Sequence, residues 1–91
     1  MTNSKENQEI LRVECADAKG LVHKITGVLF KHDLNIVQND EFVDHENGRF
    51  FMRTEFSGRA ETKKILDALR PLLPKNAVVE LTKSRKKDIV I

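Results

Sequence analysis

Residues 47–56, NGRFFMRTEF, decide the fold, because apolar and polar residues alternate there directly after an Asn-Gly pair. A period of two is typical of a β-strand with one buried face. It puts Phe50, Met52 and Phe56 on the face expected to be buried, and Phe51, Arg53 and Glu55 on the other. Asn-Gly suits the positive φ angles of a tight turn. We therefore expect a hairpin that joins this strand to NIVQNDEFVD (35–44) through HENG (45–48).

The rest of the chain supplies two helices and two further strands. A strand is expected at residues 9–17, where Leu11, Val13 and Cys15 share one face. The apolar spacing then becomes helical between residues 20 and 32. A second helix follows SGRAE (57–61) and ends near Pro71 and Pro74, because proline cannot continue the helical hydrogen bonds. The last strand is NAVVELT (76–82), with Ala77, Val79 and Leu81 expected to face inward.

This order, βαββαβ, predicts an α+β fold of the ferredoxin-like sandwich type. The four strands would form one antiparallel sheet, with strands one and three in the centre and strands two and four at the edges. Both helices would cover the same face, since right-handed crossovers return each helix to that side. The helical residues expected in the core are Leu21, Ile25, Val28, Leu29, Ile65, Leu66, Leu69 and either Leu72 or Leu73.

Length and composition limit the kind of protein. Ninety-one residues make one small domain, and the formal net charge of +2 is too balanced to imply a nucleic-acid or membrane partner. The single cysteine, the absence of a secretion signal and the lack of a 20-residue apolar run favour the cytoplasm. We expect a flexible tail at 1–8, the folded domain at 9–82, and at 83–91 a basic linker with the start of a missing domain.

The same order of elements also describes RNA-recognition domains, which stack bases on aromatic residues of the sheet. The first strand offers no aromatic residue, and the chain has no Tyr or Trp. The strand beside the aromatic one carries Asp40, Glu41 and Asp44, which would repel a phosphate backbone. No nucleic-acid partner is expected, and residues 47–56 are interpreted as scaffold.

No catalytic residue, metal site or cofactor is expected in this chain. His23 and His32 are nine residues apart, so they point in opposite directions from a helix. Asp44, His45 and Glu46 are consecutive and seldom converge on one metal. Cys15 has no evident base beside it and is expected to pack as a small hydrophobic residue.

The junction between the first strand and the first helix remains as a candidate binding site. Gly20 would allow close approach to the backbone, and the first N–H groups of the helix, at Leu21 and Val22, could receive a carboxylate. Asn35 begins the second strand with an amide that can donate and accept. The competing interpretation is that Gly20 only relieves a turn and Asn35 only ends a helix.

CADAKGLVHKITGVLFKHDLNIV (15–37) resembles an ACT domain, a βαββαβ regulatory module that pairs with another copy and often binds amino acids. VQNDEFVDHENGRFFMRTEF (37–56) is similar, more narrowly, to the N-terminal ACT domains of the formyltetrahydrofolate deformylase family. KKDIVI (86–91) resembles the start of their formyltransferase-like domain. The positions matching the ACT ligand site are Asp17, Gly20, Leu21, Asn35 and Ile36.

This resemblance implies a parent enzyme that hydrolyses 10-formyltetrahydrofolate to tetrahydrofolate and formate, which would supply purine biosynthesis and balance one-carbon metabolism. The present chain would be inactive alone. It would form a homodimer or a higher assembly through its edge strand and first helix, and it would sense an amino acid such as glycine or methionine. The alternative is a purely structural pairing module that binds no ligand.

Overall fold

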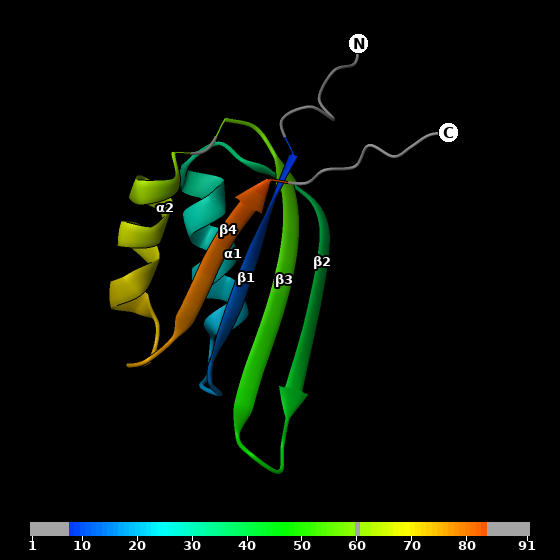
Figure 1. The fold of residues 1–91 in the computed structure, drawn as a ribbon, viewed down its shortest axis with the longest axis vertical. Coiled ribbons are helices and arrows are strands. Elements are labelled where there is room, and N and C mark those ends of the chain that lie inside the picture. Colours follow the sequence, from blue (N-terminus) through cyan, green and yellow to red (C-terminus); the bar gives the residue numbers. More distant parts are fainter. Residues whose placement is uncertain (1–7, 60, 84–91) are drawn as a thin grey trace.

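The computed structural model describes residues 8–59 and 61–83. The chain forms β1 (Gln8–Ala16), α1 (Leu21–Lys31), β2 (Asn35–Asp44), β3 (Arg49–Ser57), α2 (Thr62–Leu69), the 3-10 helix η2 (Arg70–Leu72) and β4 (Val78–Lys83). The predicted βαββαβ order is confirmed (Figure 1). The tail expected at 1–8 and the linker with a following domain expected at 83–91 lie outside the described residues, except Gln8 and Lys83, which belong to strands.

The four strands form one sheet in the order β2-β3-β1-β4, and every neighbouring pair is antiparallel. As predicted, β1 and β3 are central and β2 and β4 are the edges. Both helices pack on the same face of the sheet (Figure 1). The opposite face, here called the open face, carries no helix of the described chain. The ferredoxin-like sandwich expected from the sequence is therefore confirmed.

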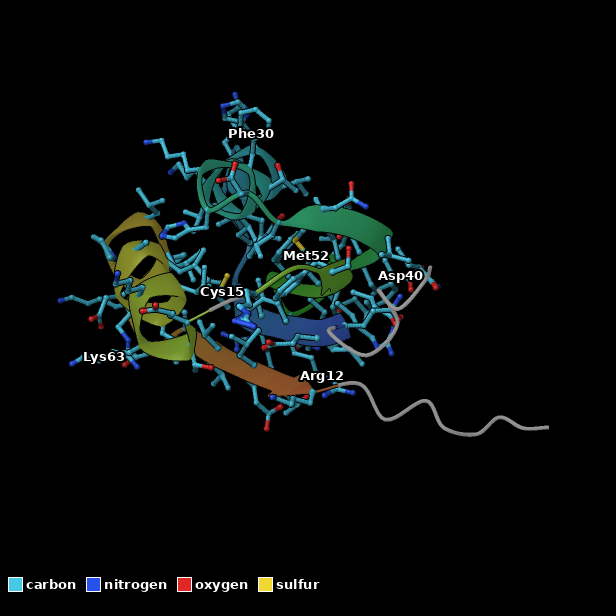
Figure 2. The ribbon with its side chains drawn as sticks, turned by 90° about the horizontal axis from the view of Figure 1, so that it is seen from above. Arg12, Cys15, Phe30, Asp40, Met52 and Lys63 are labelled. Atoms are coloured by element: carbon cyan, nitrogen blue, oxygen red, sulfur yellow. The ribbon has the colours of Figure 1, made fainter. Side chains whose placement is uncertain are left out.

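The core lies between the sheet and the two helices. β1 contributes Leu11, Val13 and Cys15, and β3 contributes Phe50, Met52 and Phe56, as their alternation predicted. Figure 2 shows Cys15 and Met52 between the layers. The helices and the turns that follow them add Leu21, Ile25, Val28, Leu29, Leu34, Ile65, Leu69 and Leu73. Each fully buried large side chain contributes about 1.5–3 kcal/mol, so this layer stabilises most of the fold.

The end of α1 directs the chain into β2. The Leu34 N–H donates to the Leu29 carbonyl and the Asp33 N–H to the Phe30 carbonyl, both at 3.0 Å. This is the Schellman arrangement, in which the residue after the cap is left-handed. Asp33 takes that conformation with φ 60°, and the following Leu34 is buried. Asn35 therefore starts the edge strand directly after an anchored turn.

Two local features differ from the pattern expected from the sequence. β2 has an irregular register between Ile36 and Gln38, so Val37 has no partner opposite it on β3. α2 ends at Leu69 and continues as η2, which contains Pro71 near its start, where a missing N–H costs little. Of the two alternatives left open, Leu73 is the buried residue and Leu72 is exposed. Neither helix in the described ranges is long and apolar enough to cross a membrane.

Candidate functional site

The junction between β1 and α1 is held at the hairpin end of the sheet. The Asp17 N–H donates to the Gly48 carbonyl at 2.9 Å, which ties the junction to the β2–β3 turn. Gly20 has φ 78° and ψ 12°, a left-handed conformation that other residues adopt only with strain. A Cβ at Gly20 would meet no atom within 4 Å. The backbone conformation, and not crowding, thus requires this glycine, and the space beside it is open.

The start of α1 offers free backbone donors at this junction. The first hydrogen bond of the helix runs from the Lys24 N–H to the Gly20 carbonyl at 3.0 Å, and no described side chain caps the helix. The N–H groups of the first turn therefore have no acceptor within the helix. The side chain of Leu21 is buried in the core, so Leu21 can offer only its backbone to a ligand, whereas Asp17 is exposed.

The other two predicted site residues lie at the opposite end of the sheet. Asn35 is paired with Ser57, which is also the partner of Gln8 at the start of β1. The junction follows Ala16, eight residues further along β1, so roughly 26 Å separate the two groups at about 3.3 Å per residue. Within one protomer, Asn35 and Ile36 therefore cannot contact a ligand held at Asp17, Gly20 and Leu21.

The open face carries a second candidate surface, although the sequence of β3 predicted only a scaffold role there. Its charged side chains form two ion pairs, Arg49 with Glu14 at 3.2 Å and Arg12 with Glu80 at 3.9 Å. Each pair joins two neighbouring strands of the sheet. Arg53 forms no ion pair with any residue in 8–59 or 61–83, and Glu55 is buried beside Ile10. The groove on this face has a volume of about 340 Å³.

Within residues 8–59 and 61–83, the nucleophilic and metal-binding side chains lie apart from one another. Cys15 is a free, buried thiol, and its burial raises the pKa of that thiol. His32, the C-cap residue of α1, has its Nδ1 2.9 Å from the Val28 carbonyl of that helix. Across the described ranges no three His, Cys, Asp or Glu side chains lie close enough together to hold a metal ion.

The family model of the ACT domain matches residues 10–74, which include most of β1, all of β2 and β3, and both helices. The chain belongs to the ACT domain family. Several proteins that are similar to this chain in sequence are named formyltetrahydrofolate deformylase. The formyltetrahydrofolate deformylase of Escherichia coli K12 is 49% identical over 84 residues, which cover 92% of this chain and 30% of that protein.

Two further comparisons agree. The formyltetrahydrofolate deformylase of Haemophilus influenzae is 44% identical over 84 residues, again 92% of this chain and 30% of that protein. The crystal structure of a formyltetrahydrofolate deformylase from Burkholderia mallei matches 85% of this ACT domain and 28% of its own chain, with a TM-score of 0.76 and 22% identity. That likeness supports the fold. The ACT domain thus spans about a third of the length of these relatives.

Proposed function

We propose that this chain is the N-terminal regulatory ACT domain of a cytoplasmic formyltetrahydrofolate deformylase. The observation that carries the proposal is the 49% identity over 84 residues to a protein of that name, of which the match covers 30%. The remaining length would hold the catalytic domain that hydrolyses 10-formyltetrahydrofolate to tetrahydrofolate and formate. Formate released in this way would be available for purine biosynthesis.

The side chains of this domain support a regulatory role and leave catalysis to the remaining length of the proposed enzyme. Hydrolysis of a formamide needs an activated water and a group that stabilises the developing oxyanion. The described residues offer no cluster for either role, since Cys15 is buried and His23 and His32 lie at opposite ends of α1, His32 as its C-cap residue. The domain is expected to bind an effector and to transmit its binding to the attached catalytic domain. The purified 91-residue chain should release no formate.

Pairing with a second copy is the first part of the proposed role. The outer edge of β2 has no strand beside it in the described chain, and an open edge is a ready template for another strand. Apolar side chains are exposed along this edge and on the adjacent helix, with Phe30 of α1 exposed to 80% and Val37 of β2 to 50%. Phe30 projects away from the sheet in Figure 2. A homodimer through β2 and α1 would cover these residues.

Such a dimer would also unite the two halves of the proposed effector site. If two β2 strands run antiparallel about a two-fold axis, the start of one lies beside the end of the other. Asn35 and Ile36 would then lie at the hairpin end of the second protomer, the end that also carries Asp17, Gly20 and Leu21. The separation of roughly 26 Å within one protomer supports a composite site over a site in a single chain.

An amino acid fits the chemistry of this composite site. The free N–H groups at the start of α1 suit its carboxylate, since helix N-termini attract negative charge. The exposed Asp17 carboxylate and the Asn35 side-chain oxygen from the second protomer suit its ammonium group. A ligand that contacts both protomers would favour one dimer geometry over another, which is the requirement for signalling to an attached domain.

Calorimetry with glycine, methionine and serine tests the effector role. Asn35→Ala should abolish the binding heat and leave the dimer intact. Gln38→Ala removes another exposed amide on β2 and serves as the matched control, which should bind normally. A stable dimer that gives no heat with any amino acid would support the purely structural role instead.

The enzymatic assignment needs a separate experiment. The reading frame after Ile91 should encode a formyltransferase-like domain, and the protein expressed from the whole gene should release formate from 10-formyltetrahydrofolate. A following sequence of another kind would contradict the deformylase assignment and leave the ACT family membership unchanged.

A further inference from the structure

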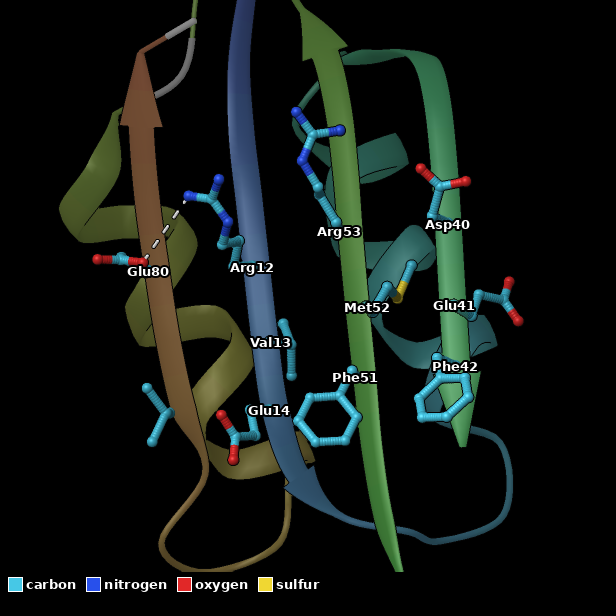
Figure 3. Close-up of a pocket in the computed structure, with 11 residues that line it drawn as sticks. Arg12, Val13, Glu14, Asp40, Glu41, Phe42, Phe51, Met52, Arg53 and Glu80 are labelled. Atoms are coloured by element: carbon cyan, nitrogen blue, oxygen red, sulfur yellow. Dashed lines mark ion pairs between the residues drawn. The ribbon is translucent and has the colours of Figure 1, made fainter. Parts of the chain in front are cut away.

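The open face has an unusual arrangement of charge across its four strands. Arg12 of β1 is directly opposite Arg53 of β3. Glu80 flanks Arg12 from β4, and Asp40 flanks Arg53 from β2. One row across the sheet therefore reads carboxylate, guanidinium, guanidinium, carboxylate (Figure 3). Like charges directly opposite each other destabilise a sheet. The pairing of Arg12 with Arg53 is therefore expected to serve a purpose other than stability.

The flanking carboxylates neutralise this pair only in part. Arg12 reaches Glu80 at a long 3.9 Å. Asp40 accepts a hydrogen bond from the Gln38 amide at 3.5 Å and lies beyond ion-pair distance of Arg53. Glu14, the nearest acid in the next row, is already paired with Arg49 at 3.2 Å. Arg53 thus keeps a half-buried charge at the centre of the sheet, without an ion-pair partner among the described residues.

The next row of the open face carries two aromatic residues beside Glu14. Phe51 and Phe42 are opposite each other on β3 and β2, and their ring centroids are 6.1 Å apart. Phe42 is exposed to 63%, and Val78 completes the row on β4 as another exposed apolar residue. Figure 3 shows the two rings side by side beneath the arginines. Together the rows line the groove of about 340 Å³, a volume in the range of small-molecule sites.

We propose that this groove binds a small aromatic carboxylic acid. Its carboxylate would lie between Arg12 and Arg53, where planar guanidinium groups can hold it through paired hydrogen bonds. Its flat ring would lie against Phe42 and Phe51, since aromatic rings stack with an offset at such distances. The site lies on the opposite face of the sheet from α1 and is separate from the proposed amino-acid site.

The charges around the groove argue against two other occupants. A polyanion such as RNA would meet Glu14, Asp40 and Glu80 as well as the arginines, and these carboxylates would repel its successive phosphates. A second copy stacked face to face about a central two-fold axis would bring four guanidinium groups together. A ligand with one carboxylate on a ring can pair with both arginines. It brings neither a row of phosphates nor further guanidinium groups to the groove.

The probe for this site is 2-naphthoate, titrated into the isotope-labelled 91-residue chain and followed by backbone amide chemical shifts. The largest shifts are expected at Arg12, Phe42, Phe51 and Arg53. Cyclohexanecarboxylate lacks the flat ring and 2-naphthalenemethanol lacks the charge, so each should bind about tenfold more weakly or worse. Glycine should move a different set of amides, which separates this site from the proposed effector site.

Two variants locate the interaction. Arg53→Gln and Phe42→Ala should each weaken naphthoate binding by about tenfold or more. Arg70→Gln, which removes an exposed arginine on η2, should bind naphthoate as the unaltered chain does. Arg53→Gln should also leave the thermal midpoint unchanged or raised, because it relieves the like-charge pair. A purely structural arginine would give the opposite result, a lower midpoint.

The proposal is overturned if naphthoate shifts no amide in the groove, or if Arg53→Gln binds it equally well. It is also overturned if the amides of Arg12 and Glu80, on strands away from the proposed dimer edge, shift when protein concentration alone is raised, because a second copy would then occupy the groove.

Discussion

The Thr54 hydroxyl donates a 2.6 Å hydrogen bond to the side-chain oxygen of Asn39, which joins the central strand β3 to the edge strand β2. Thr54 is fully buried, on the core side of the sheet, and Asn39 is half-buried. The Asn39 amide in turn donates to Glu41 at 2.9 Å. The bond lies just past the irregular register at Val37, so it fixes the alignment of β2 where the bulge would otherwise permit slippage.

Asn39→Ala should therefore destabilise the domain by about 1–3 kcal/mol, because the buried Thr54 hydroxyl would lose its acceptor. Urea unfolding measures the difference. Adding Thr54→Val should recover part of the loss, since the isosteric valine removes the unsatisfied hydroxyl. Gln38→Ala, at the exposed neighbouring position, should change stability by less than about 0.5 kcal/mol. Equal effects of the two single alanine variants would show that the bond contributes nothing.

Gly20→Ala tests whether the junction is set by the backbone. The left-handed φ of 78° should cost alanine about 1–2 kcal/mol, although a Cβ there meets no neighbour. Gly27→Ala is the matched control, because Gly27 lies inside α1 with the same open surroundings and no positive φ. It should stabilise the domain by about 0.5–1 kcal/mol. Thermal unfolding of both variants shows whether each substitution lowers or raises the stability of the domain. A stabilising Gly20→Ala would refute the backbone explanation.

Alternation and helical spacing were sufficient to predict the element order, the strand order and the inward faces. Phe50, Met52 and Phe56 are spaced so that they share one face of β3, and the position of the core follows from this. The bulge at Val37 was not predicted, because two consecutive apolar residues, Ile36 and Val37, interrupt the alternation without specifying a bulge. The Schellman turn at Asp33 was missed for a related reason, since aspartate replaces the glycine that usually signals it.

The candidate sites were harder to predict, because they depend on register and on strands distant in sequence. Gly20 and Asn35 are only fifteen positions apart, but the length of α1 carries Asn35 back to the other end of the sheet. Phe42 was overlooked as the neighbour of Phe51, since their pairing depends on the length of the hairpin turn. The opposition of Arg12 and Arg53 likewise requires the register of β1 with β3, which no local pattern specifies.

The hairpin turn should give the domain a pH-dependent stability. Asp44 accepts hydrogen bonds from the Asn47 side chain at 2.9 Å and from the backbone N–H groups of Asn47 and Glu46. These bonds, that of the Asn47 side chain foremost, hold the pKa of Asp44 below its ordinary value of 3.8. The stabilisation is therefore complete above the pKa of the unfolded chain and is lost as the pH falls through the lower folded pKa.

Asp44→Asn measures this contribution. The unaltered chain should be more stable than the variant at pH 7 and at pH 5, and the difference should shrink as the pH falls below about 3.8. Asp67→Asn makes the same charge change at an exposed position of α2 and serves as the control. A difference between the unaltered chain and Asp44→Asn that stays constant down to pH 2 would contradict a role for the carboxylate charge.

Repulsion between acidic side chains of β2 should weaken the proposed dimer. Asp40 and Glu41 lie midway along β2, so an antiparallel pair of β2 strands would bring the acids of both protomers near the two-fold axis. Glu41→Gln should therefore tighten the dimer by about three- to tenfold, because like charges across neighbouring strands repel. Raising the salt concentration should tighten the unaltered dimer and change the Glu41→Gln dimer less.

Phe30→Ala should act in the opposite direction and weaken association by about tenfold or more, because it removes the most exposed large apolar side chain from the proposed contact. Sedimentation equilibrium at several protein concentrations measures both effects. Asp67→Asn again controls for net charge, since α2 lies away from the β2 edge (Figure 1). If the dissociation constant of the dimer is unchanged in the Glu41 and Phe30 variants but changes with substitutions on β4, the two copies pair through the opposite edge of the sheet. The composite effector site could not then form, because Asn35 would no longer lie near the junction of a second protomer.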